Sequence, residues 1–116
     1  FDTYALIEMT KNNSNYIRFL DEPIVTSKFN LAEFFYIVLL EQGEAAAKKA
    51  FEKIKDSEID VPEEILSKAM LFRLKNKKKG FSYTDCIGYI LAPENNMKFL
   101  TGDDAFKDMQ NVEFVK

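Results

Sequence analysis

Four acidic residues stand where one structural element gives way to another or where a charge is unexpected. Asp85 opens the apolar run CIGYILA, and Asp103, with Asp104 beside it, comes just after the short apolar stretch MKFL. Asp2 follows the first residue, and Glu33 lies within the apolar sequence LAEFFYIVLL. Carboxylates that gather in one place repel one another and have raised pKa values unless a cation neutralises them. The chemistry that they suggest is therefore that of a bound cation.

Oxygen ligands without nitrogen or sulfur select Mg²⁺ or Mn²⁺, and Mg²⁺ characteristically takes phosphate oxygens of a substrate as further ligands. One or two such ions can activate a water molecule for in-line attack on phosphorus and stabilise the leaving oxygen. The acids therefore favour phosphodiester hydrolysis. The sequence has no His and a single Cys, which argues against nucleophilic triads, zinc fingers and imidazole general bases.

Each acid also has a purely structural explanation. Ser82-x-x-Asp85 loosely matches a capping box, in which two side chains of the first helical turn bond each other's backbone. Asp103 could be a plain N-cap, Asn30-x-x-Glu33 could mark another helix start, and the acid near the N-terminus could cap the helix that follows it. Capping does not explain why all four acids fall where a parallel sheet can bring them to one crevice.

Short predicted strands alternate with predicted helices along the whole chain. This alternation indicates a parallel α/β sheet with helices on both faces. In such a sheet the carboxyl ends of the strands and the starts of the following helices face one crevice, so the acids can converge there. The predicted strands are 23–26, 59–61, 97–100 and 112–115, and the predicted helices are 3–9, 16–20, 30–43, 44–55, 62–79 and 82–92.

The helix predicted for residues 30–43 is apolar on nearly every side. Gly43 suits the left-handed position that follows a helix. A helix that is apolar all round belongs in a protein interior, so the charge of Glu33 calls for an explanation.

The chain of 116 residues is predicted to form one domain over residues 1–116. Because it begins with Phe1 rather than Met, its first strand is expected to be truncated at the N-terminus.

The longest apolar stretch, 34–40, falls far short of the roughly 20 residues that span a bilayer. Cys86 lies in an apolar run and is predicted to be inert core that fits a reducing compartment. We therefore expect a cytoplasmic protein with no membrane contact.

One basic patch stands out in a chain whose net charge is −3. The overall charge argues against a generally basic nucleic-acid-binding surface. The patch has two interpretations: its side chains complement the negative end of a helix dipole, or they contact a phosphate backbone. The second gains weight if the neighbouring site handles phosphodiesters. The members are Arg73, Lys75, Lys77, Lys78 and Lys79.

The four acids lie within sequence segments that together resemble the PIN-domain family, in particular VapC-type toxin ribonucleases and their archaeal relatives. The resemblance covers essentially the whole chain, and the order and spacing of the segments are more specific than any one of them. The segments are Asp2-Thr3 followed by Ala5-Leu6-Ile7, Leu31-Ala32-Glu33-Phe34-Phe35, Ser82-x-x-Asp85-Cys86-Ile87 with Ala92, and Leu100-Thr101-Gly102-Asp103-x-x-Phe106.

The resemblance implies a three-layer α/β/α sandwich with a central, mainly parallel sheet, and an Mg²⁺- or Mn²⁺-dependent ribonuclease that cleaves single-stranded RNA. Thr3 and Thr101 match hydroxyls that support the family's site, and Asp104 either adds a further oxygen or caps a helix. The family's acidic catalytic and metal-binding roles fall by position on Asp2, Glu33, Asp85 and Asp103.

The resemblance also bears on partners. If the chain is a toxin, a small antitoxin protein should inhibit it. Met70, Leu71 and Phe72 give the second half of the chain more apolar surface than a small core needs, which favours a homodimer, although core burial is the favoured explanation for any one of them. Only Arg18 and Arg73 are arginines, so contacts with RNA phosphates would fall mainly to lysines.

Two other functions compete with the nuclease. A catalytically silent PIN-like module would bind RNA or a protein partner without turnover and would be indifferent to EDTA. A phosphoryl-accepting receiver domain would need an acidic pair after the first strand and a lysine after a late one. Here the pair, Asp103-Asp104, comes late, which counts against the receiver.

Overall fold

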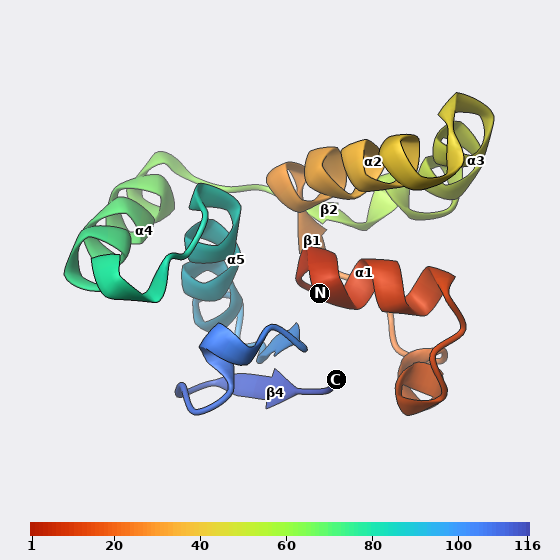
Figure 1. Cartoon of the computed structure of the whole chain (residues 1–116). Helices are drawn as coiled ribbons and strands as arrows, with labels where there is room; N and C mark the ends of the chain where they lie inside the picture. The colour runs from red at the N-terminus through yellow and green to blue at the C-terminus, as the bar shows by residue number, and fades with distance from the viewer.

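The computed structural model describes the whole sequence, residues 1–116. Five α-helices and four short strands alternate along the chain, with 3-10 helices in the connections (Figure 1). The α-helices are α1 (Thr3–Thr10), α2 (Lys28–Gln42), α3 (Glu44–Ile54), α4 (Glu63–Lys75) and α5 (Tyr83–Glu94). The strands are β1 (Thr26–Ser27), β2 (Glu58–Ile59), β3 (Phe99–Thr101) and β4 (Val112–Phe114). The 3-10 helices are η1 (Ser14–Phe19), η2 (Lys55–Ser57), η3 (Lys77–Lys79) and η4 (Asp104–Phe106).

The strands form two parallel pairs rather than one continuous ladder. β1 pairs with β2, with Thr26 opposite Glu58, and β3 pairs with β4, with Phe99 opposite Val112. Each parallel pair is connected through helices, as parallel strands require. The predicted mixed α/β fold with parallel pairing is confirmed, and the structure adds that the sheet is divided in two.

The first two residues of the chain lie between these pairs. The Phe1 nitrogen donates a hydrogen bond to the Val25 carbonyl at 2.7 Å, and the Thr26 hydroxyl donates to the Phe1 carbonyl at 2.7 Å. On the other side, the Asp2 N–H donates to the Leu100 carbonyl at 2.9 Å. Residues 1–2 therefore occupy the position of a central strand between β1 and β3. This position places Asp2 beside the end of β3.

Three groups of buried apolar side chains hold the helices against these strands. One lies between α1, α2 and α3, and another joins α1 and η1 to β3 and β4 around Tyr16 and Leu100. The third packs α4 and α5 against β3 through aromatic rings, with the centroids of Phe81 and Phe106 4.4 Å apart and Phe99 edge-on to Phe106 at 4.9 Å. Figure 1 shows α4 and α5 at one end of the molecule and the α2–α3 hairpin at the other.

Capping residues set the helix boundaries. The Ser27 hydroxyl accepts a hydrogen bond from the Asn30 N–H at 3.1 Å, so α2 begins before Asn30 and the predicted start at Asn30 is wrong. Gly43 ends α2 with a φ of +90°, a conformation that favours glycine. Pro62 is the N-cap of α4 rather than its first residue, and α4 ends at Lys75 before the lysines of η3.

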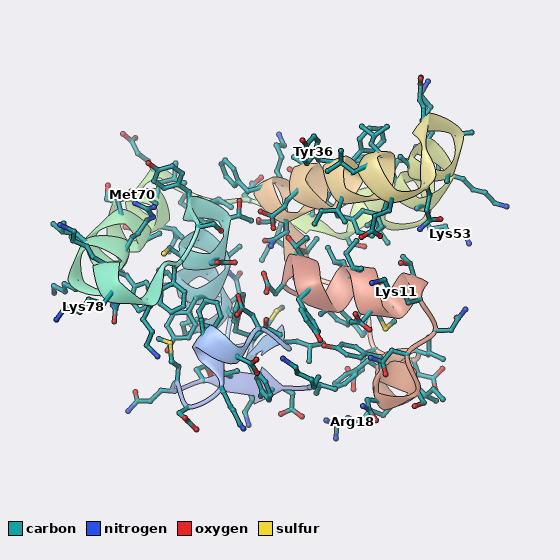
Figure 2. The ribbon with its side chains drawn as sticks, viewed as in Figure 1. Lys11, Arg18, Tyr36, Lys53, Met70 and Lys78 are labelled. Carbon is teal, nitrogen blue, oxygen red and sulfur yellow. The ribbon has the colours of Figure 1, made fainter.

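The α2 helix is not buried all round, contrary to the prediction from its apolar sequence. Phe29, Tyr36 and Leu40 are 40%, 60% and 68% exposed, while Phe34 and Val38 lie in the core. Figure 2 shows Tyr36 on the outer side of the helix. No helix combines the length and the apolar content that crossing a bilayer requires.

Candidate active site

Asp2 is the most buried of the four acids, with only 2% of its surface exposed. Its Oδ2 accepts a hydrogen bond from the Thr101 hydroxyl at 2.7 Å, and its Oδ1 accepts one from the Asn30 Nδ2 at 3.4 Å. Asp2 is the N-cap residue of α1, but its side chain makes no capping hydrogen bond. The capping explanation therefore fails for Asp2, whose carboxylate is turned toward β3 and α2.

Asn30 is a site residue that the sequence analysis missed. Its side chain is 1% exposed, and its Nδ2 donates to the Thr3 hydroxyl at 3.0 Å as well as to Asp2. Its Oδ1 accepts from the Ser27 hydroxyl at 2.6 Å. Asn30 stands between Phe29 and Leu31, so the criterion that singled out Glu33, a polar residue in an apolar helix, would have found it.

Asp103 is joined to Asp2 through Thr101. The buried Thr101 hydroxyl donates to Asp2 and accepts from the Asp103 N–H at 3.1 Å. The Asp103 Oδ1 accepts from the Ala105 N–H at 3.0 Å and caps η4, as the structural explanation expected. The other carboxylate oxygen, Oδ2, has no hydrogen-bond partner in the protein. Asp103 therefore caps a turn with one oxygen and keeps the other free.

Asp85 likewise has a local role and a free oxygen. Its Oδ2 accepts from the Ser82 N–H at 2.9 Å, and the Ser82 hydroxyl accepts from the Asp85 N–H at 3.0 Å. This reciprocal capping box starts α5, so the capping explanation for Asp85 is confirmed. The Oδ1 of Asp85 makes no hydrogen bond to the protein.

Glu33 does not cap a helix. Because Ser27 caps α2, Glu33 lies in the second turn, beyond the backbone N–H groups that a cap can reach. Its half-buried side chain is absent from every hydrogen bond and salt bridge of the chain. The absence of a structural partner leaves its carboxylate available for a ligand.

Electrostatics link the four acids. Burial raises the pKa of Asp2 to about 7; the Thr101 hydrogen bond opposes this shift, whereas the charges of Asp85 and Glu33 add to it. Burial also raises the pKa of Asp85; the hydrogen bonds of Ser82 oppose the rise, and the charges of Asp103 and Glu33 reinforce it. The charges of Glu33, Asp85 and Asp103 therefore each act on another acid of the group. None of the four takes part in any of the seven salt bridges of the chain.

A family model of the PIN domain matches residues 1–112. The chain belongs to the PIN-domain family. PIN domains are generally nucleases, and the family typically uses divalent metal ions. Neither the comparison with curated proteins nor the comparison with solved structures gives a match. The family predicted from the four sequence segments is thus confirmed.

The side chains of the PIN-domain site supply suitable donor atoms for a divalent ion, but they are not arranged as a complete set of ligands. No three acidic, His or Cys side chains are arranged to hold a metal ion as they stand. The donors themselves fit: all are carboxylate oxygens, neighbouring carboxylates help to raise the pKa values of Asp2 and Asp85, and none of them forms a salt bridge with Lys or Arg. An ion at this PIN-domain site would therefore have to draw the free oxygens of Asp85 and Asp103 toward Asp2.

The two supporting residues named with the acids differ in their surroundings. The Thr3 side chain is buried, and its hydroxyl accepts from Asn30 beneath Asp2. Asp104 instead forms a surface ion pair with Lys116 at 2.8 Å, which lowers the Asp104 pKa. The structure therefore places Thr3 in the network of this PIN domain and gives Asp104 a cationic partner of its own.

The predicted basic patch borders the acids. The Arg73 Nε donates to the Phe81 carbonyl at 3.0 Å, directly before the Ser82 cap. The Lys79 ammonium donates to the Ala105 carbonyl at 3.3 Å, and Ala105 in turn bonds Asp103. Figure 2 shows Lys78 at the outer end of this segment. The patch thus lies next to the PIN-domain acids on two sides.

Proposed function

We propose that this PIN domain is a divalent-metal-dependent endoribonuclease that hydrolyses phosphodiester bonds of single-stranded RNA. Asp2, Asp85 and Asp103 would hold Mg²⁺ or Mn²⁺, and Glu33 would help to bind the ion or orient the attacking water. The observation that carries the proposal is a group of four acids, none of them in a salt bridge, in which neighbouring carboxylates help to raise the pKa values of Asp2 and Asp85. A divalent cation relieves that repulsion and is the cofactor typical of the family.

The ion would supply Lewis acidity and a water molecule of lowered pKa. The chain's own residues would position the reaction. Thr101 and Asn30 hold the Asp2 carboxylate by its two oxygens, so Asp2 is the fixed ligand. Asp85 and Asp103 each keep one oxygen outside their caps and would turn it toward the ion. Glu33, held by no partner, is free to reach the water.

Two variants separate the metal role of Asp85 from its capping role. Asp85→Asn keeps an oxygen that can accept from the Ser82 N–H but removes the charge. Ser82→Ala removes the hydroxyl half of the capping box and keeps the carboxylate. Loss of an N-cap costs about 1 kcal/mol of stability. We expect Asp85→Asn to abolish Mn²⁺-stimulated cleavage with little change in melting temperature, and Ser82→Ala to lower the melting temperature but remain active.

The measurement is cleavage of a labelled single-stranded RNA in Mn²⁺, with EDTA as the blank, alongside thermal unfolding of each variant. Wild-type activity in Asp85→Asn would rule out the assigned role of this acid. Loss of activity in Ser82→Ala, in proportion to its loss of stability, would mean that Asp85 acts mainly as a cap.

A catalytically silent PIN-like module that binds RNA or a protein is the second candidate. The observation that favours it is the open arrangement of the acids, no three of which form a metal cluster as they stand. It predicts RNA association that is the same with EDTA and with Mn²⁺, and no cleavage products in either. Metal-dependent turnover would exclude it.

We propose three further properties of the nuclease: a cytoplasmic location, inhibition by a small antitoxin protein, and a homodimer. Met70 and Leu71 on α4 are 37% and 58% exposed, which supports a contact surface, whereas Phe72 stacks on Phe81 and Tyr89 in the core. Light scattering of wild type and Leu71→Lys tests the dimer. A dimeric wild type and a monomeric variant are expected; a monomeric wild type would exclude it.

A further inference from the structure

We infer that Tyr83 and Arg73 form a nucleotide-binding subsite beside the acids, in which an unstacked base of the RNA packs on the Tyr83 ring and its phosphate contacts the Arg73 guanidinium. The inference rests on the proposed function, because it states where the substrate of the same acids binds. It also gives a physical reason for a preference for single strands.

Arg73 is held in place by two contacts. Its Nε donates to the Phe81 carbonyl at 3.0 Å, and its guanidinium carbon lies 4.3 Å from the centre of the Tyr83 ring. The other guanidinium nitrogens make no hydrogen bond or salt bridge with the protein. A planar guanidinium with free N–H groups is suited to phosphate, and its preorganisation reduces the entropy lost when it binds.

Tyr83 offers an aromatic surface to solvent. It is the first residue of α5 and is 62% exposed, although an aromatic ring of its size is usually more buried. Bases stack on exposed aromatic side chains with little dependence on sequence, because every base has a π-face. Only an unpaired base can leave its neighbours to do so, and therefore the subsite should select single strands.

The positive charges around this pair are not neutralised by the protein. Seven Lys and Arg residues elsewhere in the chain form salt bridges. The five cations of the patch form none, although the chain carries a net charge of −3. A cluster of unpaired cations in an acidic protein is an electrostatic footprint for a polyanion. These five are Arg73, Lys75, Lys77, Lys78 and Lys79.

The subsite lies next to the acids. Arg73, which packs on the Tyr83 ring, bonds the Phe81 carbonyl directly before Ser82, and the Ser82 N–H bonds Asp85. Lys79 reaches Ala105, whose N–H bonds Asp103. A strand that crosses the N-terminal end of α5 would therefore meet both the stacking ring and the acids.

A cavity adjoins Arg73 on its other side. It has a volume of about 420 Å³ and lies between the end of α4 and the turn that leads to α5. Met70, Leu74 and Phe81 supply apolar walls, and Arg73 and Lys77 supply positive charge. Ligand pockets are typically about 300–1,000 Å³, so the neighbouring nucleotide has room here.

The test is fluorescence anisotropy in EDTA, where no cleavage occurs, with a short labelled RNA and with a duplex of the same sequence. Tyr83→Leu removes the aromatic ring, and Tyr83→Phe keeps it. Stacking is worth roughly a 5- to 150-fold change in affinity per base. We expect Tyr83→Leu to weaken single-strand binding within this range, Tyr83→Phe to bind like wild type, and the duplex to bind weakly to all three. The inference would be overturned if Tyr83→Leu bound the single strand as tightly as wild type. It would also be overturned if Tyr83→Phe lost as much single-strand affinity as Tyr83→Leu.

A charge-matched pair of variants controls for non-specific attraction. Lys77→Gln with Lys78→Gln removes two cations of the patch, and Lys49→Gln with Lys53→Gln removes two from α3, which also lack salt bridges. Figure 2 shows Lys53 and Lys78 at opposite ends of the molecule. Only the first pair should weaken binding and reduce its salt dependence. Equal losses in both pairs would mean that the patch has no special role.

Cleavage by wild type is measured separately in Mn²⁺. If wild type does not cleave but Tyr83→Leu loses single-strand binding, the proposed hydrolysis fails and the subsite stands. If wild type cleaves and Tyr83→Leu binds and cleaves as well as wild type, the nuclease stands and the subsite fails.

Discussion

Asp2 carries a carboxylate into nearly complete burial without a salt bridge to any Lys or Arg side chain. Burial of an ionised carboxylate is unfavourable unless hydrogen bonds or an opposite charge compensate it. The Thr101 hydroxyl and the Asn30 amide compensate in part, but the pKa of Asp2 still rises to about 7. Without a bound metal cation, the charged Asp2 side chain therefore destabilises the folded state. This is the expected property of a metal ligand.

The stability of Asp2→Asn should depend on pH in a defined direction when metal is chelated. Because the pKa of Asp2 is raised from 3.8 to about 7 on folding, the folded state keeps a proton that the unfolded state releases in this window, and wild-type stability falls as pH rises through it. The Asp2→Asn variant does not show this loss of stability, because its side chain does not titrate. Its free energy of unfolding in EDTA, relative to wild type, should rise by a few kcal/mol from about pH 4 to pH 8.

Urea unfolding at the two pH values measures this difference. Asp104→Asn is the control, because the Asp104 pKa is lowered rather than raised, so its ionisation does not reduce stability as pH rises through the window. A difference between Asp2→Asn and wild type that is constant with pH would show that Asp2 is not protonated near neutrality.

Asn30 should affect metal binding without being a ligand. Asn30→Ala removes one side-chain hydrogen bond each from Thr3, Asp2 and Ser27, and an unsatisfied buried polar group costs about 1–3 kcal/mol. Loss of a residue that orients a metal ligand typically weakens metal affinity about 10- to 100-fold. We expect both effects, measured by urea unfolding and by Mn²⁺ titration. Ser27→Ala keeps the Asn30 amide donors and should lose stability with a smaller change in Mn²⁺ affinity; equal affinity in Asn30→Ala and wild type would contradict the role.

Element boundaries explain what the sequence could and could not predict. Helical periodicity and caps are local, so the helices and the positions of Asp85 and Asp103 at element starts were predictable. The strands were placed less well: β1 begins at Thr26 and β3 at Phe99, later than predicted, because strands this short carry almost no pattern. The contacts of Asp2 with Asn30 and Thr101 join residues 28 and 99 positions apart, and no local pattern contains them.

The connection between β3 and η4 depends on the absence of a side chain at Gly102. A Cβ atom there would collide with the Tyr4 ring and with the Val115 backbone carbonyl. Gly102→Ala should therefore push apart Thr101 and Asp103, lowering stability by about 1–3 kcal/mol and reducing Mn²⁺ affinity. Gly88→Ala is the comparison, since its Cβ would meet only the edge of the Phe99 ring closely, at 2.9 Å. A smaller loss in Gly102→Ala than in Gly88→Ala, by urea unfolding, would contradict this account.

At the scale of the whole molecule, the four acids come from four different elements. Asp2 precedes α1, Glu33 lies on α2, Asp85 starts α5 and Asp103 precedes η4. α5 and α2 belong to the groups of helices that Figure 1 shows at the two ends of the molecule. Asp2 lies between the two strand pairs, and η4 connects β3 to β4. An ion shared by these acids would tie the parts together, and ligands that bind the folded state alone raise its stability.

Calorimetric titration with Mn²⁺ on wild type and Asp85→Asn tests the central claim most directly, because it examines the metal site without requiring knowledge of the RNA target. We predict saturable binding to wild type and an affinity lower by about tenfold or more in Asp85→Asn, since a ligand should matter at least as much as the residues that orient it. No binding to wild type, or equal affinity in the variant, would contradict the account and leave Asp85 as the cap of α5.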